Sequence, residues 1–287
     1  MPPPSATAIL LVSCPDQHGI VAALSAFITG HNGNIIALDQ YVDTVDGVFF
    51  ARMEWDMQGF ALPLDHFDTA FASIADSHQM EWRLHQSATR PRMAVMVSRQ
   101  GHCLYDILAR TECGEWPADI ACVLSNHADH ASLVERHGIP FHHIPMPPNG
   151  KAEAEQQQLQ LLRTAHIDFI VLARYMQILS PEFVTAFPCR ILNIHHSFLP
   201  AFAGARPYHA AYDRGVKIIG ATAHYVTAAL DEGPIIEQDV IRVSHRQGVE
   251  DLIRLGRDLE KIVLSRAIYA HLTHRILTYK NRTVVFN

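Results

Sequence analysis

The sequence predicts a two-domain α/β protein, in which a ferredoxin-like βαββαβ domain precedes a Rossmann-like, mostly parallel, doubly wound sheet. Its 287 residues exceed what one small hydrophobic core organises. The first 86 residues show the element order of a split βαβ module, whereas short apolar runs alternate with helical segments after residue 92. Apolar residues make up 48% and charged residues 18% of the chain, which is typical of a folded globular protein.

The first domain is predicted from five local patterns. An apolar, β-prone run at 6–14 is followed by helical periodicity at 20–30, which stops at a glycine. Two strand-like runs then meet at Asp46-Gly47, a dipeptide typical of a β-hairpin turn. A second helix at 64–77 and a strand at 81–86 complete the order strand, helix, strand, strand, helix, strand.

A linker separates the two predicted domains. Residues 87–91 have linker composition, and Pro91 cannot donate a hydrogen bond to a sheet. We therefore expect a regulatory domain at 1–86 and a catalytic domain at 92–287.

The second domain is predicted from runs of consecutive apolar residues, which are typical of parallel strands buried on both faces. We expect these strands at 92–98, 119–126, 140–146, 168–174 and 190–195. Further along, we expect a strand pair at 217–226 and 234–243, a helix at about 249–279, and an edge strand in RTVVFN at 282–287.

Composition excludes several classes of function. The net charge is −6 without a long basic run, so no nucleic-acid partner is expected. No apolar run is long enough for a membrane span or a signal peptide, and the five cysteines form no CxxC, which favours a reducing cytoplasm. Histidine pairs such as His127/His130 and His271/His274 lack a third ligand at a typical spacing, so we expect no metal site.

Polar residues end the predicted strand at 190–195, where ligands bind in α/β sheets. Asn193 and His195 are two residues apart, so both side chains lie on one face of the strand and offer donors to a developing oxyanion. Asp231, between two later strands, is the best candidate for handling protons. Spacing alone leaves open that Asn193 and His195 are hydrogen-bonded structural residues and that Asp231 is a turn or cap residue.

The segment NIHHSFLPAFAGARPYHAAYDRGVKIIGATAHYVTAALDEGPII (193–236) closely resembles the folate-dependent formyltransferase family. That family carries Asn-x-His in a strand and a later Asp before Gly-Pro. The doubled histidine and the GARPYH continuation resemble its deformylase branch. CPDQHGIV (14–21) and HNGNI (31–35) resemble an ACT domain, a ligand-sensing version of the ferredoxin-like fold. Together the two resemblances cover nearly the whole chain.

The resemblance implies hydrolysis of 10-formyltetrahydrofolate to formate and tetrahydrofolate. Asn193 and protonated His195 would stabilise the oxyanion formed when water attacks the formyl carbon, and Asp231 would orient that water and accept its proton. The reaction needs neither a metal nor a cofactor, since the folate is the substrate. Its purpose would be to balance one-carbon folate pools and to supply formate for purine synthesis.

The resemblance also implies where the pterin ring of the folate binds. The pocket is expected from two facing segments, and its residues are Met176, Gln177, Leu179, Val226, Thr227 and Leu230. His224, on the strand that leads to Asp231, is a supporting residue or a satisfied strand histidine. His196 should point to the face opposite His195 and support the site indirectly.

For the ACT domain, the resemblance implies an amino-acid effector such as glycine or methionine, and pairing into a dimer or tetramer. The expected effector residues lie at the first strand-to-helix turn and the facing loop: Asp16, Gln17, His18, Gly19, Asn32 and Asn34. A helix N-terminus suits the effector's carboxylate. Alternatively, Asp16 or Gln17 caps the helix, and Gly33 and Asn34 only shape a turn.

The identity of the formyl acceptor is predicted from the turn after the first strand of the second domain. Formyltransferases that use a phosphorylated acceptor carry a glycine-rich SGxGSNL-type turn there, whereas this chain has SRQGHCL (98–104) with a single glycine. Water is therefore the expected acceptor. Transfer to a small amine, and a non-catalytic folate or amino-acid sensor, are the two alternative functions.

Overall fold

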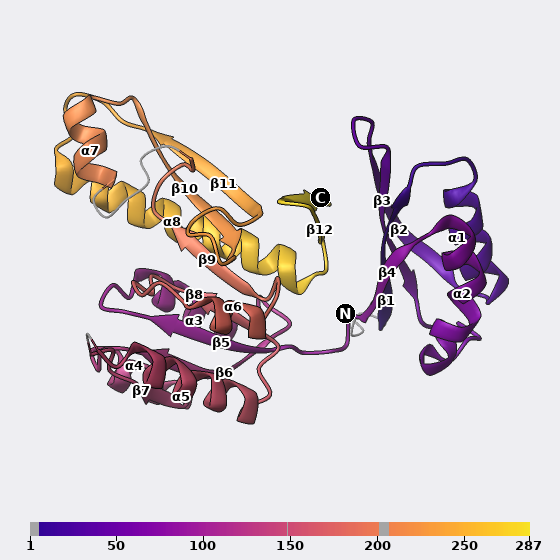
Figure 1. The fold of residues 1–287 in the computed structure, drawn as a ribbon, viewed down its shortest axis with the longest axis horizontal. Helices are drawn as coiled ribbons and strands as arrows, with labels where there is room; N and C mark the ends of the chain where they lie inside the picture. Colours follow the sequence, from indigo (N-terminus) through magenta and orange to yellow (C-terminus); the bar gives the residue numbers. More distant parts are fainter. Residues whose placement is uncertain (1–5, 148, 201–206) are drawn as a thin grey trace. The chain divides into compact units, whose positions relative to one another are not determined.

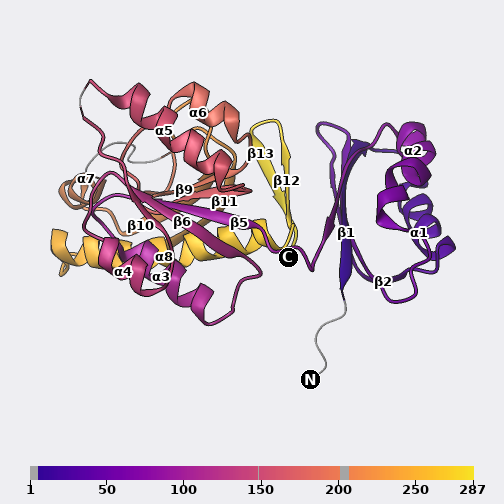
Figure 2. The same cartoon turned by 90° about the horizontal axis from the view of Figure 1, so that it is seen from below.

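The computed structural model describes residues 6–147, 149–200 and 207–287, so part of the quoted 193–236 segment lies outside the described residues. The chain forms two compact units (Figures 1 and 2). The first comprises Met1–Arg90, Thr273–Tyr279 and Val284–Asn287, and the second comprises Pro91–Leu272 and Lys280–Thr283. Within the described residues, no helix combines the length and apolar character needed to cross a bilayer.

The first unit has the predicted ferredoxin-like fold. Its elements in chain order are β1 (Thr7–Pro15), α1 (Ile20–Gly30), β2 (Asn34–Asp43), β3 (Val48–Asp56), a 3₁₀ turn (Leu64–His66), α2 (Phe67–His78) and β4 (Glu81–Gln86). The strands form an antiparallel sheet in the order β2-β3-β1-β4. One face of this sheet is covered by α1 and α2, which Figure 1 shows side by side.

The other face of this sheet packs against the strands of a C-terminal hairpin, β12 (Ile276–Tyr279) and β13 (Arg282–Val285). Leu11 and Phe50 of the sheet form a buried cluster with Leu277 and Phe286. The predicted helix to residue 279 is therefore wrong at its end: α8 stops at Leu272, and His274 adopts a left-handed backbone (φ 52°). The expected strand at 282–287 exists, but it pairs with β12 rather than with the large sheet.

The second unit is the predicted doubly wound α/β sheet. Its elements are β5 (Arg92–Val97), α3 (His102–Glu112), β6 (Asp119–Ser125), α4 (Ala131–Arg136), β7 (Phe141–His143), α5 (Lys151–Thr164), β8 (Phe169–Leu172), α6 (Pro181–Ala186), β9 (Ile191–His195), α7 (Pro207–Arg214), β10 (Ile218–Tyr225), β11 (Ile235–Arg242) and α8 (Val249–Leu272). The sheet order is β11-β10-β9-β8-β5-β6-β7.

The topology of this sheet places its ligand-binding edge. Strands β5 to β9 pair in parallel. The predicted late strand pair, β10 and β11, extends the sheet in antiparallel orientation. Helices α5 and α6 cover one face and α3 and α8 the other (Figure 2). The strand order reverses between β5 and β8, and such switch points are where α/β sheets bind ligands.

An aromatic cluster holds the first unit together, and Phe71→Ala tests it. Phe71 is fully buried, and its ring centroid lies 5.2 Å from those of Phe27 and Trp82. We expect the substitution to lower the free energy of unfolding by about 3–5 kcal/mol, because it leaves a cavity among these rings. Urea unfolding followed by tryptophan fluorescence measures this loss. Val45→Ala, at a position 91% exposed, is the control and should change little; equal effects of both substitutions would contradict the packing argument.

Candidate active site

Strand β9 ends in two polar side chains on one face. Asn193 is partly buried and His195 is 7% exposed. Strand β10 runs antiparallel beside β9, and its register places His224 opposite Asn193. The predicted strand end therefore carries an amide and two imidazoles within a mostly buried region.

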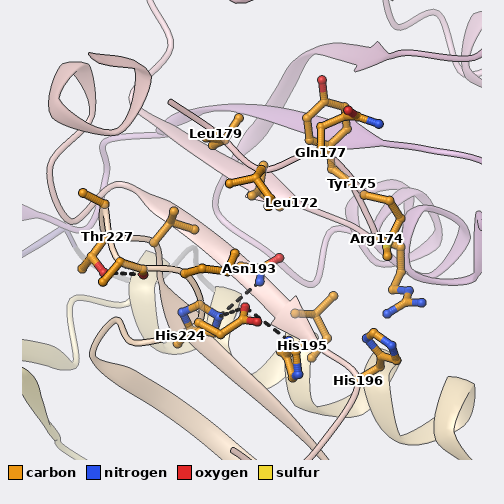
Figure 3. Close-up of a pocket in the computed structure, with 18 residues that line it drawn as sticks. Leu172, Arg174, Tyr175, Gln177, Leu179, Asn193, His195, His196, His224 and Thr227 are labelled. Atoms are coloured by element: carbon orange, nitrogen blue, oxygen red, sulfur yellow. Dashed lines mark hydrogen bonds and ion pairs between the residues drawn. The ribbon is translucent and has the colours of Figure 1, made fainter. Parts of the chain in front are cut away.

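The loop between β10 and β11 brings Asp231 to His195. Asp231 Oδ1 lies 3.2 Å from His195 Nδ1 (Figure 3). The backbone of Asp231 is left-handed (φ 56°), a conformation that short polar residues tolerate better than most. The hydrogen bond from His195 lowers the pKa of the Asp231 carboxyl, so this group is ionised at neutral pH.

The second ring nitrogen of His195, Nε2, is buried and has no hydrogen-bond partner among the described residues. An unpaired buried polar atom costs free energy unless a ligand or water supplies its partner. Since Asp231 fixes Nδ1 on one side of the ring, Nε2 faces the position where such a partner would bind.

His224 fixes the orientation of the Asn193 amide. His224 Nδ1 lies 2.9 Å from the Tyr225 carbonyl oxygen, so this nitrogen carries the proton and donates. Its Nε2 then accepts a hydrogen bond from Asn193 Nδ2 at 3.1 Å. Burial lowers the pKa of His224, which keeps the ring neutral. The 3.8 Å separation between His224 Nε2 and Asp231 Oδ1 is too long for a hydrogen bond.

A cavity of about 410 Å³ opens beside these residues. All six residues predicted to contact the folate line it together with Asn193, His195 and Asp231. Those six are Met176, Gln177, Leu179, Val226, Thr227 and Leu230. The cavity is mostly apolar, with polar groups at one side, as is typical of sites that bind flat ring systems.

Three hydrogen bonds hold the segment that forms one wall of this cavity. Met176 N donates to Ser98 Oγ at 3.0 Å, and Ser180 N donates to Glu155 Oε1 at 3.1 Å. Gln158, which is fully buried, donates to the Tyr175 hydroxyl at 3.0 Å. Glu155 and Gln158 could not be predicted as supporting residues, because both lie in the polar helix α5 and only the folded chain shows that they are buried.

His196 was expected to point away from His195, but it lines the same cavity. Strand β9 ends at His195, and His196 lines one end of the cavity as well as a smaller cavity beyond it. The two ring centroids are 5.3 Å apart. Burial, followed by the charge of Arg174, lowers the pKa of His196 to about 4, so its imidazole is neutral at neutral pH.

The six expected effector residues are all exposed in the first unit. Gly19 is the N-cap of α1 with φ 90°, and no side chain caps this helix, so the expectation that Asp16 or Gln17 caps it is wrong. Gln17 instead donates to the His78 carbonyl oxygen at 3.3 Å. Asn32 adopts φ 61° and donates to the Gly59 carbonyl oxygen, while Asn34 begins β2.

Known protein families match both units of the chain. The formyl transferase family model matches residues 91–268, and the ACT domain model matches residues 8–54. A formyltetrahydrofolate deformylase from Synechocystis sp. is 55% identical over 280 residues, covering 98% of this chain and 98% of its own length. This chain belongs to the formyltetrahydrofolate deformylase family. The family resemblance found in the sequence is thus confirmed.

Other members of the formyltetrahydrofolate deformylase family agree over almost the whole length. The deformylase from Bacillus subtilis is 52% identical over 279 residues, covering 97% of this chain and 93% of its own length. The crystal structure of a deformylase from Pseudomonas syringae pv. tomato has a TM-score of 0.97 and 48% identity, covering 99% of this chain and 96% of that chain. The predicted fold class is confirmed for both units.

Gly233→Ala tests how the Asp231 loop is held. A Cβ at Gly233 would overlap the carbonyl oxygen of Tyr225, whose amide bonds Pro234 O at 2.9 Å. We expect the loop to shift, the His195–Asp231 contact to lengthen beyond 3.2 Å, and stability to fall by about 1–3 kcal/mol. A crystal structure and thermal unfolding measure both effects.

The control for this substitution is Gly248→Ala, because no described atom lies within 4 Å of the Cβ it would add. It should leave both stability and the contact unchanged. An intact His195–Asp231 contact in a Gly233→Ala variant of normal stability would contradict the proposed constraint.

Proposed function

We propose that this protein hydrolyses 10-formyltetrahydrofolate to formate and tetrahydrofolate. The observation that carries this proposal is the buried, unpartnered His195 Nε2, which lies beside an oriented Asn193 amide and opposite an ionised Asp231. The names of the relatives support it, since formyltetrahydrofolate deformylases from two organisms match nearly the whole chain.

The pterin ring would occupy the apolar part of the cavity. Met176 and Leu230 are 53% and 60% exposed and border its mouth, while Leu179 is buried further inside. A flat heteroaromatic ring that enters this slot would bring the formyl group on N10 to Asn193 and His195. Binding of the ring would thus orient the reacting carbon before any bond changes.

Hydrolysis then follows from the polar groups. Water attacks the formyl carbon, forming a C–O bond and a tetrahedral oxyanion, which accepts hydrogen bonds from Asn193 Nδ2 and His195 Nε2. Asp231 turns Oδ1 toward His195 and His224, so Oδ2 is the oxygen that orients the water and accepts its proton. The C–N10 bond breaks as that proton moves to N10, releasing formate and tetrahydrofolate.

The physiological role we propose is to balance one-carbon folate pools and to supply formate for purine synthesis in the cytoplasm. All five cysteines are free thiols, which fits a reducing compartment. Because the pKa of Asp231 is lowered, its activity as a base would persist down through the ordinary carboxyl range and be lost only as the pH falls through the lowered value.

Asp231→Asn and Asn193→Ala test the reaction. With 10-formyltetrahydrofolate as the only substrate, we expect formate release to fall about 10²–10⁴-fold for Asp231→Asn, because the water loses its base. We expect a fall of about 10²–10³-fold for Asn193→Ala, because the oxyanion loses a donor. A formate assay with purified protein measures both.

The control is Asp239→Asn, which removes the charge of a partly exposed carboxylate that pairs with Arg266 in the same unit. It should retain full activity. Formate release that depends on an added amine would point to a formyltransferase, and the absence of any turnover would leave a sensor of folate or amino acids.

We further propose that the first unit binds an amino acid such as glycine or methionine at the start of α1. This helix has no side-chain cap and no acidic residue in its first turn, so the N–H groups of that turn can donate hydrogen bonds to a carboxylate. Pairing of two such units into a dimer or tetramer would be supported by the exposed apolar residues Ile36 and Leu38 on the edge strand β2.

Isothermal titration with a panel of amino acids tests the effector proposal. We expect heat from at least one member of the panel and weaker binding by Asn34→Ala, which removes an exposed amide at the expected site. Asn149→Ala, an exposed asparagine in the second unit, is the matched control. No heat from any amino acid, together with unchanged formate release in its presence, would refute the proposal.

A further inference from the structure

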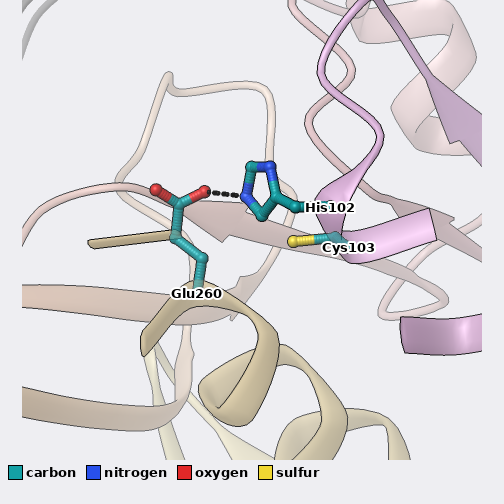
Figure 4. A group of neighbouring side chains, drawn as sticks. All are labelled: His102, Cys103 and Glu260. Carbon is teal, nitrogen blue, oxygen red and sulfur yellow. Dashed lines mark hydrogen bonds and ion pairs between the residues drawn. The ribbon is translucent and has the colours of Figure 1, made fainter. Parts of the chain in front are cut away.

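A buried group of charged side chains lies at the switch point of the large sheet, beyond His196. Glu260 of α8 is 1% exposed, and Arg174, which follows β8, is 7% exposed. His102 and Cys103, at the start of α3 after β5, complete the group (Figure 4). The proposed reaction uses none of these residues, yet buried charges are rare unless they are paired.

Glu260 is the centre of this group. Its Oε2 lies 2.8 Å from His102 Nε2 and 3.4 Å from Arg174 Nε, and its Oε1 accepts a hydrogen bond from Tyr208 at 2.7 Å. Burial alone would raise the pKa of Glu260, but the His102 hydrogen bond and the Arg174 charge lower it below its ordinary value. Glu260 is therefore a fixed carboxylate with both oxygens occupied.

These contacts also disfavour a metal ion, although His102, Cys103 and Glu260 are ligand types within 4.8 Å of one another. The Arg174 guanidinium already shares the Glu260 oxygen that a cation would need. Burial and the nearby Glu260 raise the pKa of the Cys103 thiol well above its ordinary range, which opposes the thiolate that binds metals.

Tyr208 connects Glu260 to the catalytic cavity. Its ring centroid lies 5.9 Å from that of His196, and its hydroxyl reaches back to Glu260. Gly256 makes this possible: a Cβ there, one turn before Glu260 on α8, would overlap the Tyr208 ring. The helix surface is therefore shaped to hold this phenol against His196.

Among the described residues, Arg174 and His196 line one end of the catalytic cavity. Figure 3 shows them pointing toward one another, beyond His195 and away from Thr227 and Leu179. If the folate occupies the slot at the other end, the formyl acceptor must approach from the end that Arg174 and His196 line. The Arg174 guanidinium is held there by Glu260 and by Gln100, whose Oε1 lies 3.2 Å from Nη2.

We propose that this group determines the formyl acceptor: Glu260 holds Arg174 directly and His196 through Tyr208, so that their end of the cavity admits water but not an amine. This inference rests on the proposed hydrolysis and explains its specificity. In the excluded reaction, an amine nitrogen would attack the formyl carbon, the C–N10 bond would break, and the proton lost by the amine would reach N10. Only the nucleophile differs from hydrolysis, so its access decides the product.

Two substitutions at Tyr208 separate volume from hydrogen bonding. Tyr208→Ala removes the ring behind His196 and should let the imidazole retreat. With glycinamide as the probe amine, we expect about tenfold or more formylglycinamide than the wild type produces. Tyr208→Phe keeps the ring but removes the hydrogen bond through which Glu260 holds it, so formylglycinamide should rise by less than in Tyr208→Ala. Tyr212→Ala, an exposed tyrosine on the same helix, is the matched control.

His102→Ala tests the same end of the cavity through Glu260, because it removes the contact between His102 Nε2 and the Glu260 carboxylate. The control is His209→Ala, since His209 is an exposed histidine of α7. Formate and formylglycinamide are both quantified, and circular dichroism checks folding. A product ratio unchanged from wild type in folded Tyr208→Ala and His102→Ala variants would overturn the inference. A wild-type protein that releases no formate from 10-formyltetrahydrofolate alone would instead overturn the proposed hydrolysis, so the two failures are distinguishable.

Discussion

The site depends on the contact between His195 Nδ1 and Asp231 Oδ1. This contact joins the end of β9 to the loop between β10 and β11, which carries Asp231. It leaves His195 Nε2 facing the cavity and keeps Asp231 ionised. The loop can reach His195 only because Asp231 adopts a left-handed backbone and Gly233 packs directly on the Tyr225 backbone. One charged contact thus requires two unusual backbone positions.

Most of the fold could be predicted because the local patterns agree with the global structure. Helix α1 begins and ends at the predicted residues, and the Asp46-Gly47 turn joins β2 and β3 as expected. The end of α8 could not be predicted, because neither glycine nor proline marks it and the 272–279 segment is stabilised by packing of Leu277 on Phe50, far away in sequence. Such tertiary contacts leave no local signal.

The site could be predicted only in part, for a related reason. Asn193, His195 and Asp231 stand in a segment that resembles a known family, although their spacing alone left structural roles open, and the structure brings them to one cavity. Glu260, by contrast, is one acidic residue in a long helix rich in charged residues, and only its burial beside Arg174 distinguishes it. Its role depends on residues from α3, α7 and the end of β8, which no sequence period relates.

The C-terminal hairpin has a consequence for how the chain acquires its structure. Residues 273–279 and 284–287 belong to the first compact unit, although they are synthesised after residues 91–272 of the second. Leu11 and Phe50 therefore remain without their apolar cover while the ribosome translates the intervening residues. The sheet of the first unit therefore acquires its apolar cover only after residues 273–279 and 284–287 have been translated.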